Sequence, residues 1–321
     1  MRNIFTATLE KLFVVPADTF DNVKGKFPIG FQIYDTKKHE VFQSVLADVF
    51  DANQNFIGTK EFSTFNNAIF LNKWLATFKD KKAPIARLNY KCNDFQHQNR
   101  NCIIHFNQTV SLGDGDFSVS KSNLIIPSIY LAIRHAIEAT WLNDRDQFLY
   151  PNDGWQTDSE FQNDCLAYTL FSNNIQSHFG INHWQPFTEY EVNARTKFDS
   201  NFMTDFISGK LRNDVSEGET QDMHNLETTQ RTTPLVFSAQ AQAVFGSGKA
   251  LWLYFHQQPN CNVNASYYDI REHFQGRNAA GKMNNKSDNA TYMGLIKNLR
   301  EQLKLLQKNI EPKIYEYKFL K

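Results

Sequence analysis

The chain has 321 residues, of which 41% are hydrophobic and 14% aromatic, so it is long and apolar enough for one large or two modest domains. Lysine plus arginine equals aspartate plus glutamate at 34 each, so the overall charge does not point to a nucleic-acid partner and only local patches remain for that role. Four scattered cysteines exclude a disulfide framework, and without a signal-peptide core or an apolar run of 18 residues we expect a cytoplasmic protein with no membrane contact.

The first sixty residues are predicted to be rich in β-structure. Residues 3–10 are expected to be the end of a helix, and LFVV (12–15) and IGFQIYD (29–35) predict two strands joined by a polar loop. SVLADVFD and FIGTKEF flank the turn-prone ANQN, which predicts a hairpin. Neither a helix end nor a lone apolar strand can bury its apolar side unaided, so this opening needs partners from elsewhere.

FPIGF (27–31) is an unusual start for a strand. Proline cannot donate to a sheet ladder, so it belongs at the first residue of a strand or on an edge, and an interior glycine often marks a close approach of backbone or ligand. The motif therefore predicts a special environment at this strand.

Residues 61–211 are predicted to form a mixed α/β region. Its longest apolar helical stretch is LIIPSIYLAIRHAIEATWL (124–142), where Pro127 is tolerated in the first turn. CIIHF and DFSVS predict strands. The other predicted helices cover residues 66–78, 159–177 and 198–208.

Residues 212–233 have almost no large apolar side chain and an excess of acids, which predicts a mobile loop or linker. Residues 234–321 follow as a helical, basic region with helices over 238–257 and 290–309 and a loop rich in glycine and asparagine over 276–289. One apolar stripe marks the last helix, with the members Leu295, Leu299, Leu303, Leu306 and Ile310.

GRNAAGKM (276–283) has the spacing of a phosphate-binding P-loop up to its last position. Met283 cannot supply the hydroxyl that binds Mg²⁺, and the segment follows a helix-like stretch where the motif requires a strand. We therefore expect no nucleoside-triphosphate site here.

Two patterns resemble metal sites without completing them. DANQNFIGTKEF lacks the glycine and the bidentate glutamate of a calcium loop, because Phe56 and Phe62 occupy those positions, and a hairpin turn is expected instead. Four further residues depart from the usual zinc-ligand spacing and fit a pair of strands better, namely Cys92, His97, Cys102 and His105.

The end of the chain is locally basic. From Arg271 onward it holds 11 Lys or Arg and 5 acidic residues, a net charge of +6 that suits contacts with phosphate groups. A solvated helix face is the alternative explanation for part of this charge. The candidate DNA-binding residues are Arg271, Arg277, Lys282 and Lys286, together with Lys24 and Lys26 in the first loop.

Five stretches together resemble adenine-specific N6 DNA methyltransferases of bacterial restriction-modification systems, and the resemblance runs over nearly the whole chain. They are ADTFDNVKGKFPIGFQIYDTK, NDFQHQN, HWQPFTEYEVNARTKFDSNFM, VNASYYDIREHFQGRN and PKIYEYKFLK.

This resemblance implies an α/β fold in which residues 1–60 are the last strands of a partial Rossmann-like methyltransferase sheet, followed by the helix-rich mixed α/β remainder. Phe27-Pro28 begin the last, antiparallel strand, and Gly30 keeps the backbone slim beside its neighbours. Phe20 matches the aromatic residue placed beside the flipped-out adenine. The Gly-rich loop for S-adenosylmethionine and the tetrapeptide [DNS]-P-P-[YFW] are both missing from the chain. No cofactor or catalytic residue is therefore expected here, although the complete family enzyme uses S-adenosylmethionine.

The resemblance thus predicts the C-terminal part of a site-specific DNA N6-adenine methyltransferase that binds double-stranded DNA, with residues 61–211 as the recognition region. Such a chain is expected to be inactive alone and to need a polypeptide that carries the missing part. Two alternatives remain open: a non-enzymatic DNA-binding or subunit-contact module beside a separately encoded methyltransferase, and a nonfunctional gene fragment.

Overall fold

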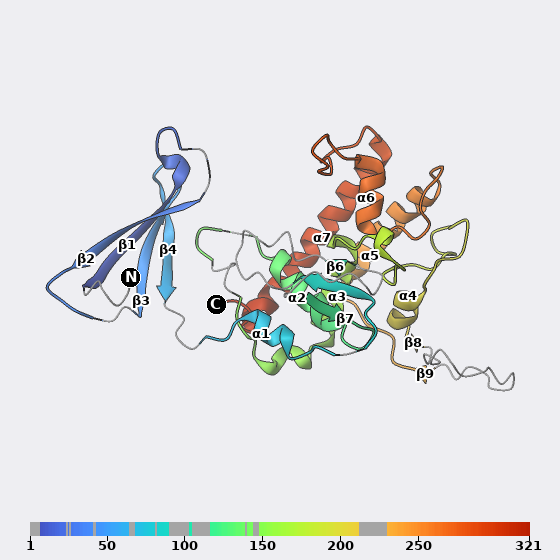
Figure 1. Ribbon diagram of the computed structural model, residues 1–321, viewed down its shortest axis with the longest axis horizontal. Coiled ribbons are helices and arrows are strands. Elements are labelled where there is room, and N and C mark those ends of the chain that lie inside the picture. The colour runs from blue at the N-terminus through green and yellow to red at the C-terminus, as the bar shows by residue number, and fades with distance from the viewer. Residues whose placement is uncertain are drawn as a thin grey trace. The chain divides into compact units, whose positions relative to one another are not determined.

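The chain divides into two units, each with its own buried residues (Figure 1). Unit 1 comprises Met1–Ile69, Glu138–Arg145 and Lys321, and unit 2 comprises Phe70–Ile137 and Asp146–Leu320. The first division thus falls after residue 69, and the segments 70–137, 146–211 and 234–320 share unit 2. The computed structural model describes residues 7–23, 25, 27–40, 43–63, 68–80, 82–89, 103–104, 116–138, 140–143, 148–211 and 230–321.

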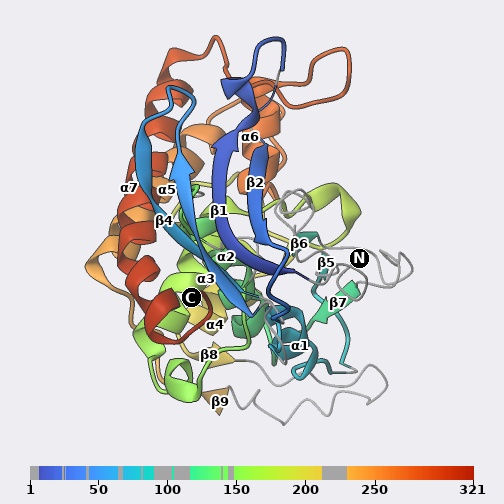
Figure 2. The same cartoon turned by 90° about the vertical axis from the view of Figure 1, so that its left-hand side faces the viewer.

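Unit 1 contains a mixed four-stranded sheet in the order β2-β1-β3-β4 (Figures 1 and 2). β2 pairs antiparallel with β1, β1 pairs parallel with β3, and β3 pairs antiparallel with β4. The two predicted strands and the predicted hairpin are confirmed. The expected helix over residues 3–10 is wrong for residues 8–10, which belong to β1. The strands are β1 (Thr8–Pro16), β2 (Pro28–Asp35), β3 (Ser44–Phe50) and β4 (Phe56–Ser63).

The turn between β3 and β4 is held by one side chain. Asp51 Oδ1 accepts hydrogen bonds from the backbone N–H groups of Asn53 and Asn55 at 2.9 Å, and Oδ2 accepts from Asn55 Nδ2 at 3.0 Å. These bonds, first among them that from the Asn55 side chain, lower the pKa of the Asp51 carboxyl. The stretch is therefore a hairpin turn, as expected, and its aspartate serves the turn.

FPIGF stands at the edge of this sheet. Pro28 is the first residue of β2, which is an edge strand. A proline is tolerated at this position although it lacks the N–H that a sheet ladder uses. Gly30 lies opposite Val14, and a Cβ built there would meet the nearest atom of Leu12 at 3.4 Å, an ordinary contact. The described residues therefore place the proline as expected but do not require a glycine at position 30.

Unit 2 is built around four helices, and α7 packs against the other three (Figures 1 and 2). Its buried stripe is Tyr292, Ile296, Leu299, Leu303, Leu306, Ile310 and Ile314, which follows the predicted stripe except at Leu295. The helix continues seven residues beyond the predicted end, through Pro312, because Ile314 is buried in the core. The four helices are α2 (Ile125–Ala136), α3 (Ser159–Ser172), α5 (Ala239–His256) and α7 (Ala290–Glu316).

Shorter elements complete unit 2. Strands β5 (Ala86–Asn89), β6 (Ile103–Ile104) and β7 (Asp116–Val119) form an antiparallel sheet in the order β6-β5-β7, and β8 (Lys210–Leu211) pairs with β9 (Gln230–Arg231). The remaining helices are α1 (Leu71–Ala76), α4 (Phe202–Ile207) and α6 (Tyr267–Gln275), and the 3-10 turns of this unit are Asp153–Gln156 and Ser177–Phe179. A further 3-10 turn, Ala17–Thr19, follows β1 in unit 1. The predicted helices of this region therefore exist, all with shorter bounds except α7, which is longer, and the chain is of the mixed α/β class. Among the helices of the described residues, none combines the length and the apolar character needed to cross a membrane.

Candidate nucleic-acid interface

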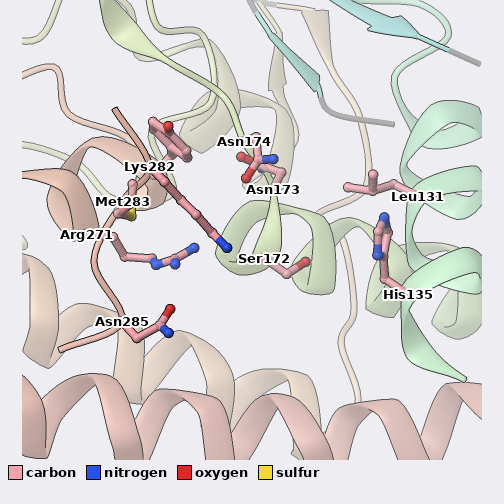
Figure 3. Close-up of a pocket in the computed structure, with 10 residues that line it drawn as sticks. Leu131, His135, Ser172, Asn173, Asn174, Arg271, Lys282, Met283 and Asn285 are labelled. Carbon is pink, nitrogen blue, oxygen red and sulfur yellow. The ribbon is translucent and has the colours of Figure 1, made fainter. Parts of the chain in front are cut away.

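A cleft of about 430 Å³ lies within unit 2, between the C-terminal parts of α2 and α3 on one side and α6 with its following loop on the other (Figure 3). Its polar lining side chains are mainly amides and bases, and no carboxylate belongs to the set that the described residues provide. The lining residues are Leu131, His135, Ser172, Asn173, Asn174, Tyr268, Arg271, Lys282, Met283 and Asn285.

Helix α6 is fixed at its start by a capping box. The Ser266 hydroxyl accepts from the Asp269 N–H while the Asp269 carboxylate accepts from the Ser266 N–H at 2.8 Å. The same carboxylate accepts from the Ser177 N–H at 3.0 Å, which ties α6 to the segment after α3. Asp269 therefore links the start of α6 to the segment that follows α3.

Arg271 projects from α6 into the cleft (Figure 3). Its Nε donates to Gln275 Oε1 at 3.3 Å, and its guanidinium carbon lies 5.5 Å from the centre of the Tyr267 ring. These two contacts restrain the side chain but leave the terminal nitrogens of the guanidinium available to a ligand.

The loop after α6 is a tight hairpin that carries Lys282. The Asn278 N–H donates to the Lys282 carbonyl at 2.9 Å, and Asn278 Oδ1 accepts from the Ala280 and Lys282 N–H groups at 3.0 Å. Gly281 turns the chain with φ of +73°, a conformation that favours glycine. The segment is thus a small hairpin rather than a P-loop between a strand and a helix.

Arg277 braces this hairpin from inside. Its guanidinium donates to the Glu272 carboxylate, to the Gly281 carbonyl at 2.7 Å and to the Tyr268 hydroxyl at 2.8 Å. The bond to Glu272 raises the pKa of the guanidinium above its ordinary value, and the bond to Tyr268 acts in the same direction. Arg277 therefore positions the loop from which Lys282 enters the cleft.

The cleft carries uncompensated positive charge. The two acids of α6 are engaged elsewhere, since Asp269 caps the helix and Glu272 pairs with Arg277. Across the part of the chain that the structure describes, neither Arg271 nor Lys282 forms an ion pair. Both charges thus face the cleft without a carboxylate partner, as an anion site requires.

The opposite wall is made by the end of α3. Asn173 is buried, donates through Nδ2 to the Thr169 carbonyl and accepts the Ile175 N–H through Oδ1 at 2.9 Å. The Ser172 hydroxyl donates to the Tyr168 carbonyl. His135 and Leu131 face the cleft from α2 (Figure 3).

The structure places the candidate DNA-binding residues in different settings. Arg271 and Lys282 line the cleft, Arg277 lies behind it in the hairpin, and Lys286 is exposed without lining it. Lys24 and Lys26 lie outside the described residues. The cleft also contains residues that the sequence analysis did not select, above all His135 and Asn174, because nothing in their local sequence distinguishes them from ordinary helix-end residues.

Phe20 belongs to unit 1 and joins an aromatic cluster at the edge of its sheet. Its ring centre lies 6.0 Å from that of Phe31, which stacks on Phe13 at 4.7 Å. The Phe20 side chain still exposes 39% of its surface. It therefore packs locally and presents part of its ring to solvent.

No group of three His, Cys, Asp or Glu side chains among the described residues is arranged to hold a metal ion, and Cys92, His97, Cys102 and His105 all lie outside those residues. Comparison with protein-family models, with curated proteins and with solved structures finds no match to this chain.

Proposed function

We propose that the chain is the DNA-binding C-terminal part of an adenine-specific N6 DNA methyltransferase, and that the cleft of unit 2 grips the phosphate backbone. The observation that carries the proposal is the pair Arg271 and Lys282, which line one cleft without a carboxylate partner among the described residues. Phosphate contacts from such side chains supply most of non-specific DNA affinity and fix the register of a protein on the duplex.

The N-terminal unit supports the same proposal in a second way. β1, the short turn after it, Phe20 and the antiparallel edge strand β2 follow one another in the order that the resemblance implies. Under this proposal, Phe20 offers a stacking face to an adenine rotated out of the duplex. The S-adenosylmethionine loop and the [DNS]-P-P-[YFW] tetrapeptide would come from a polypeptide that carries them, and the complex would act on DNA in the cytoplasm.

A second candidate is a DNA-binding or subunit-contact module that works beside a separately encoded methyltransferase. The observation that favours it is the absence of both motifs from the 321 residues. The two candidates share the DNA-binding cleft and differ in what the complementing polypeptide supplies.

Salt-dependent DNA binding tests the shared part. We expect Arg271→Gln combined with Lys282→Gln to make the slope of log K against log salt shallower by about 0.9 where the two side chains share one phosphate and by about 1.8 where each neutralises its own. Fluorescence anisotropy of a labelled duplex between about 50 and 200 mM salt measures this slope.

The matched control is Lys304→Gln combined with Lys308→Gln on the exposed face of α7, which removes the same charge outside the cleft. This control is expected to keep the slope of the unaltered protein. A slope that responds only to the α7 pair would assign the basic charge to the helix face and contradict the cleft as the DNA contact.

A further inference from the structure

The cleft has two walls of different chemistry. Arg271 and Lys282 stand on one side, and the C-terminal end of α3 with Asn174 lies on the other (Figure 3). A helix C-terminus carries a partial negative charge of about half a unit, so it attracts hydrogen-bond donors and disfavours anions. A ligand that fits both walls has an anionic group at one end and a donor group at the other.

The cationic wall is organised before any ligand binds. Arg271 is restrained by Gln275 and by the Tyr267 ring, and Lys282 sits on a hairpin fixed by its own backbone bonds. An arginine matches the geometry of phosphate oxygens with two parallel N–H groups, and a lysine adds a point charge. One phosphate between the two side chains is the simplest occupant of this wall.

The wall at α3 can recognise a base edge. The Asn173 side chain already forms hydrogen bonds with the backbone at the end of α3. No hydrogen bond joins the Asn174 side chain to another described residue. A free amide pairs with an exocyclic amine and a neighbouring ring nitrogen, which is how asparagine recognises adenine. Leu131 and Met283 add apolar surface for the faces of a ring.

The size of the cleft selects among nucleic-acid ligands. About 430 Å³ lies within the range of pockets that enclose small molecules. A base pair with both backbones is too large for such a space, whereas a single nucleotide is an appropriate size. A nucleotide that is not base-paired can therefore fill the cleft with its phosphate and its base, whereas a paired duplex can place only its backbone there.

We propose that the cleft holds one unpaired nucleotide of bound DNA whose base is adenine or cytosine, because these bases present an exocyclic amine beside an unprotonated ring nitrogen on the Watson–Crick edge, whereas guanine presents its amine beside a protonated one. Its phosphate binds Arg271 and Lys282, and its amine faces Asn174 at the end of α3. The inference rests on the DNA-binding function proposed above and adds the identity of the bound unit.

Duplexes with one bulged nucleotide test the inference. We expect a bulged dA or dC to bind at least about 5-fold more tightly than a fully paired duplex, since one bidentate amide–base contact is gained. A bulged dT and a bulged abasic site are expected to bind like the paired duplex. Anisotropy with the four bulged duplexes at one salt concentration gives the comparison.

Asn174→Ala is the diagnostic variant, and Gln240→Ala, which removes an exposed amide from the first turn of α5, is its control. Asn174→Ala should remove the preference for dA and dC while keeping the affinity for the paired duplex and its salt slope. Gln240→Ala should keep the preference. Circular dichroism of both variants checks that they fold alike.

The outcomes separate the two proposals. Tight binding of paired DNA with no gain from bulged dA or dC, or an equal gain from dT, overturns the nucleotide site and leaves the DNA-binding function standing. Absence of salt-dependent duplex binding overturns the function itself. Free dAMP that binds as tightly as the dA-bulged duplex would show that the ligand is a free nucleotide, which contradicts a DNA-borne one.

Discussion

The two units differ in how completely they bury their apolar side chains. Unit 1 has a small buried cluster of Leu12, Val14, Val45 and Ala47, and the opposite face of its sheet exposes Phe31, Ile33 and Leu46. Unit 2 buries three tryptophans almost completely, in one continuous core, namely Trp74, Trp184 and Trp252. Because apolar burial is the main favourable contribution to folding, unit 2 is expected to be the more stable of the two.

This difference also separates two kinds of surface. The cleft of unit 2 is a polar, charged feature held by a fully packed scaffold, so its side chains are fixed for recognition. The exposed face of unit 1 is apolar, and surfaces of this kind favour association. If packing sets the difference between the units, substitutions in the core of unit 2 should cost much more stability than substitutions on the exposed face of unit 1.

The largest expected effect concerns His256, which is buried at the end of α5. Neither ring nitrogen has a hydrogen-bond partner among the described residues, and burial, with a smaller contribution from the charge of Arg195, lowers the pKa of His256 from 6.5 to about 4. The unfolded chain binds more protons between these two values, so the free energy of unfolding falls as the pH drops from about 6.5 to about 4.

The loss attributable to this group approaches about 3 kcal/mol at the acid end of that window. His256→Phe should remove that part of the pH dependence, whereas replacement of the exposed His178 by Asn should keep it. Urea unfolding at a series of pH values measures the difference. Parallel curves for the unaltered protein and His256→Phe would contradict a buried neutral histidine in the folded state.

A pair of glycines in α5 gives the next effect. A Cβ on Gly248 would lie 2.2 Å from Phe171 Cε1, whereas a Cβ on Gly246 would meet nothing within 4 Å. Phe171 cannot move aside, because Phe187, Phe245 and Trp252 surround its ring. The two positions are two residues apart in α5, so they lie on nearly opposite sides of the helix.

Gly248→Ala should therefore lower the free energy of unfolding of unit 2 by about 1 to 3 kcal/mol through overpacking. Gly246→Ala should raise it by about 0.5 to 1 kcal/mol, since alanine is the better helix former on an exposed face. Urea unfolding followed by circular dichroism at 222 nm gives both values in one series. Equal effects at the two sites would show that α5 does not pack against α3 as described.

The sequence predicted a helix or strand well where the pattern of apolar and turn residues within that segment is enough to define it. Alternation in β1 and β2, the ANQN turn and the leucine spacing of α7 each require only near neighbours along the chain. The end of α7 was missed because the burial of Ile314, a tertiary contact, stabilises the helix beyond Pro312. Local patterns do not contain that information.

The cleft was only half predictable for the same reason. Arg271 and Lys282 stand in a locally basic stretch, so composition identified them. His135 and Asn174 reach the cleft only because α2, α3 and α6 pack together, with Asp269 bonded to Ser177. The count of basic residues could not place Arg277 behind the cleft either. Its hydrogen bonds to Glu272 and Tyr268 determine that position, and a count of charges contains neither bond.

The smallest expected change in stability concerns Leu46 on the exposed face of unit 1. Its side chain exposes 64% of its surface, and the strand register places it on the face opposite the buried cluster. Leu46→Thr should change the free energy of unfolding by less than about 0.5 kcal/mol, because little apolar surface is removed from a packed site. Its neighbour Ala47 is fully buried, and Ala47→Leu should cost about 1 to 3 kcal/mol by overpacking.

If the apolar face drives self-association, Leu46→Thr combined with Ile33→Thr should also shift sedimentation velocity profiles toward the monomer at high protein concentration. A cost at Leu46 as large as that at Ala47 would mean that the face is covered in solution, and the contrast between a loosely packed unit 1 and a fully packed unit 2 would fail.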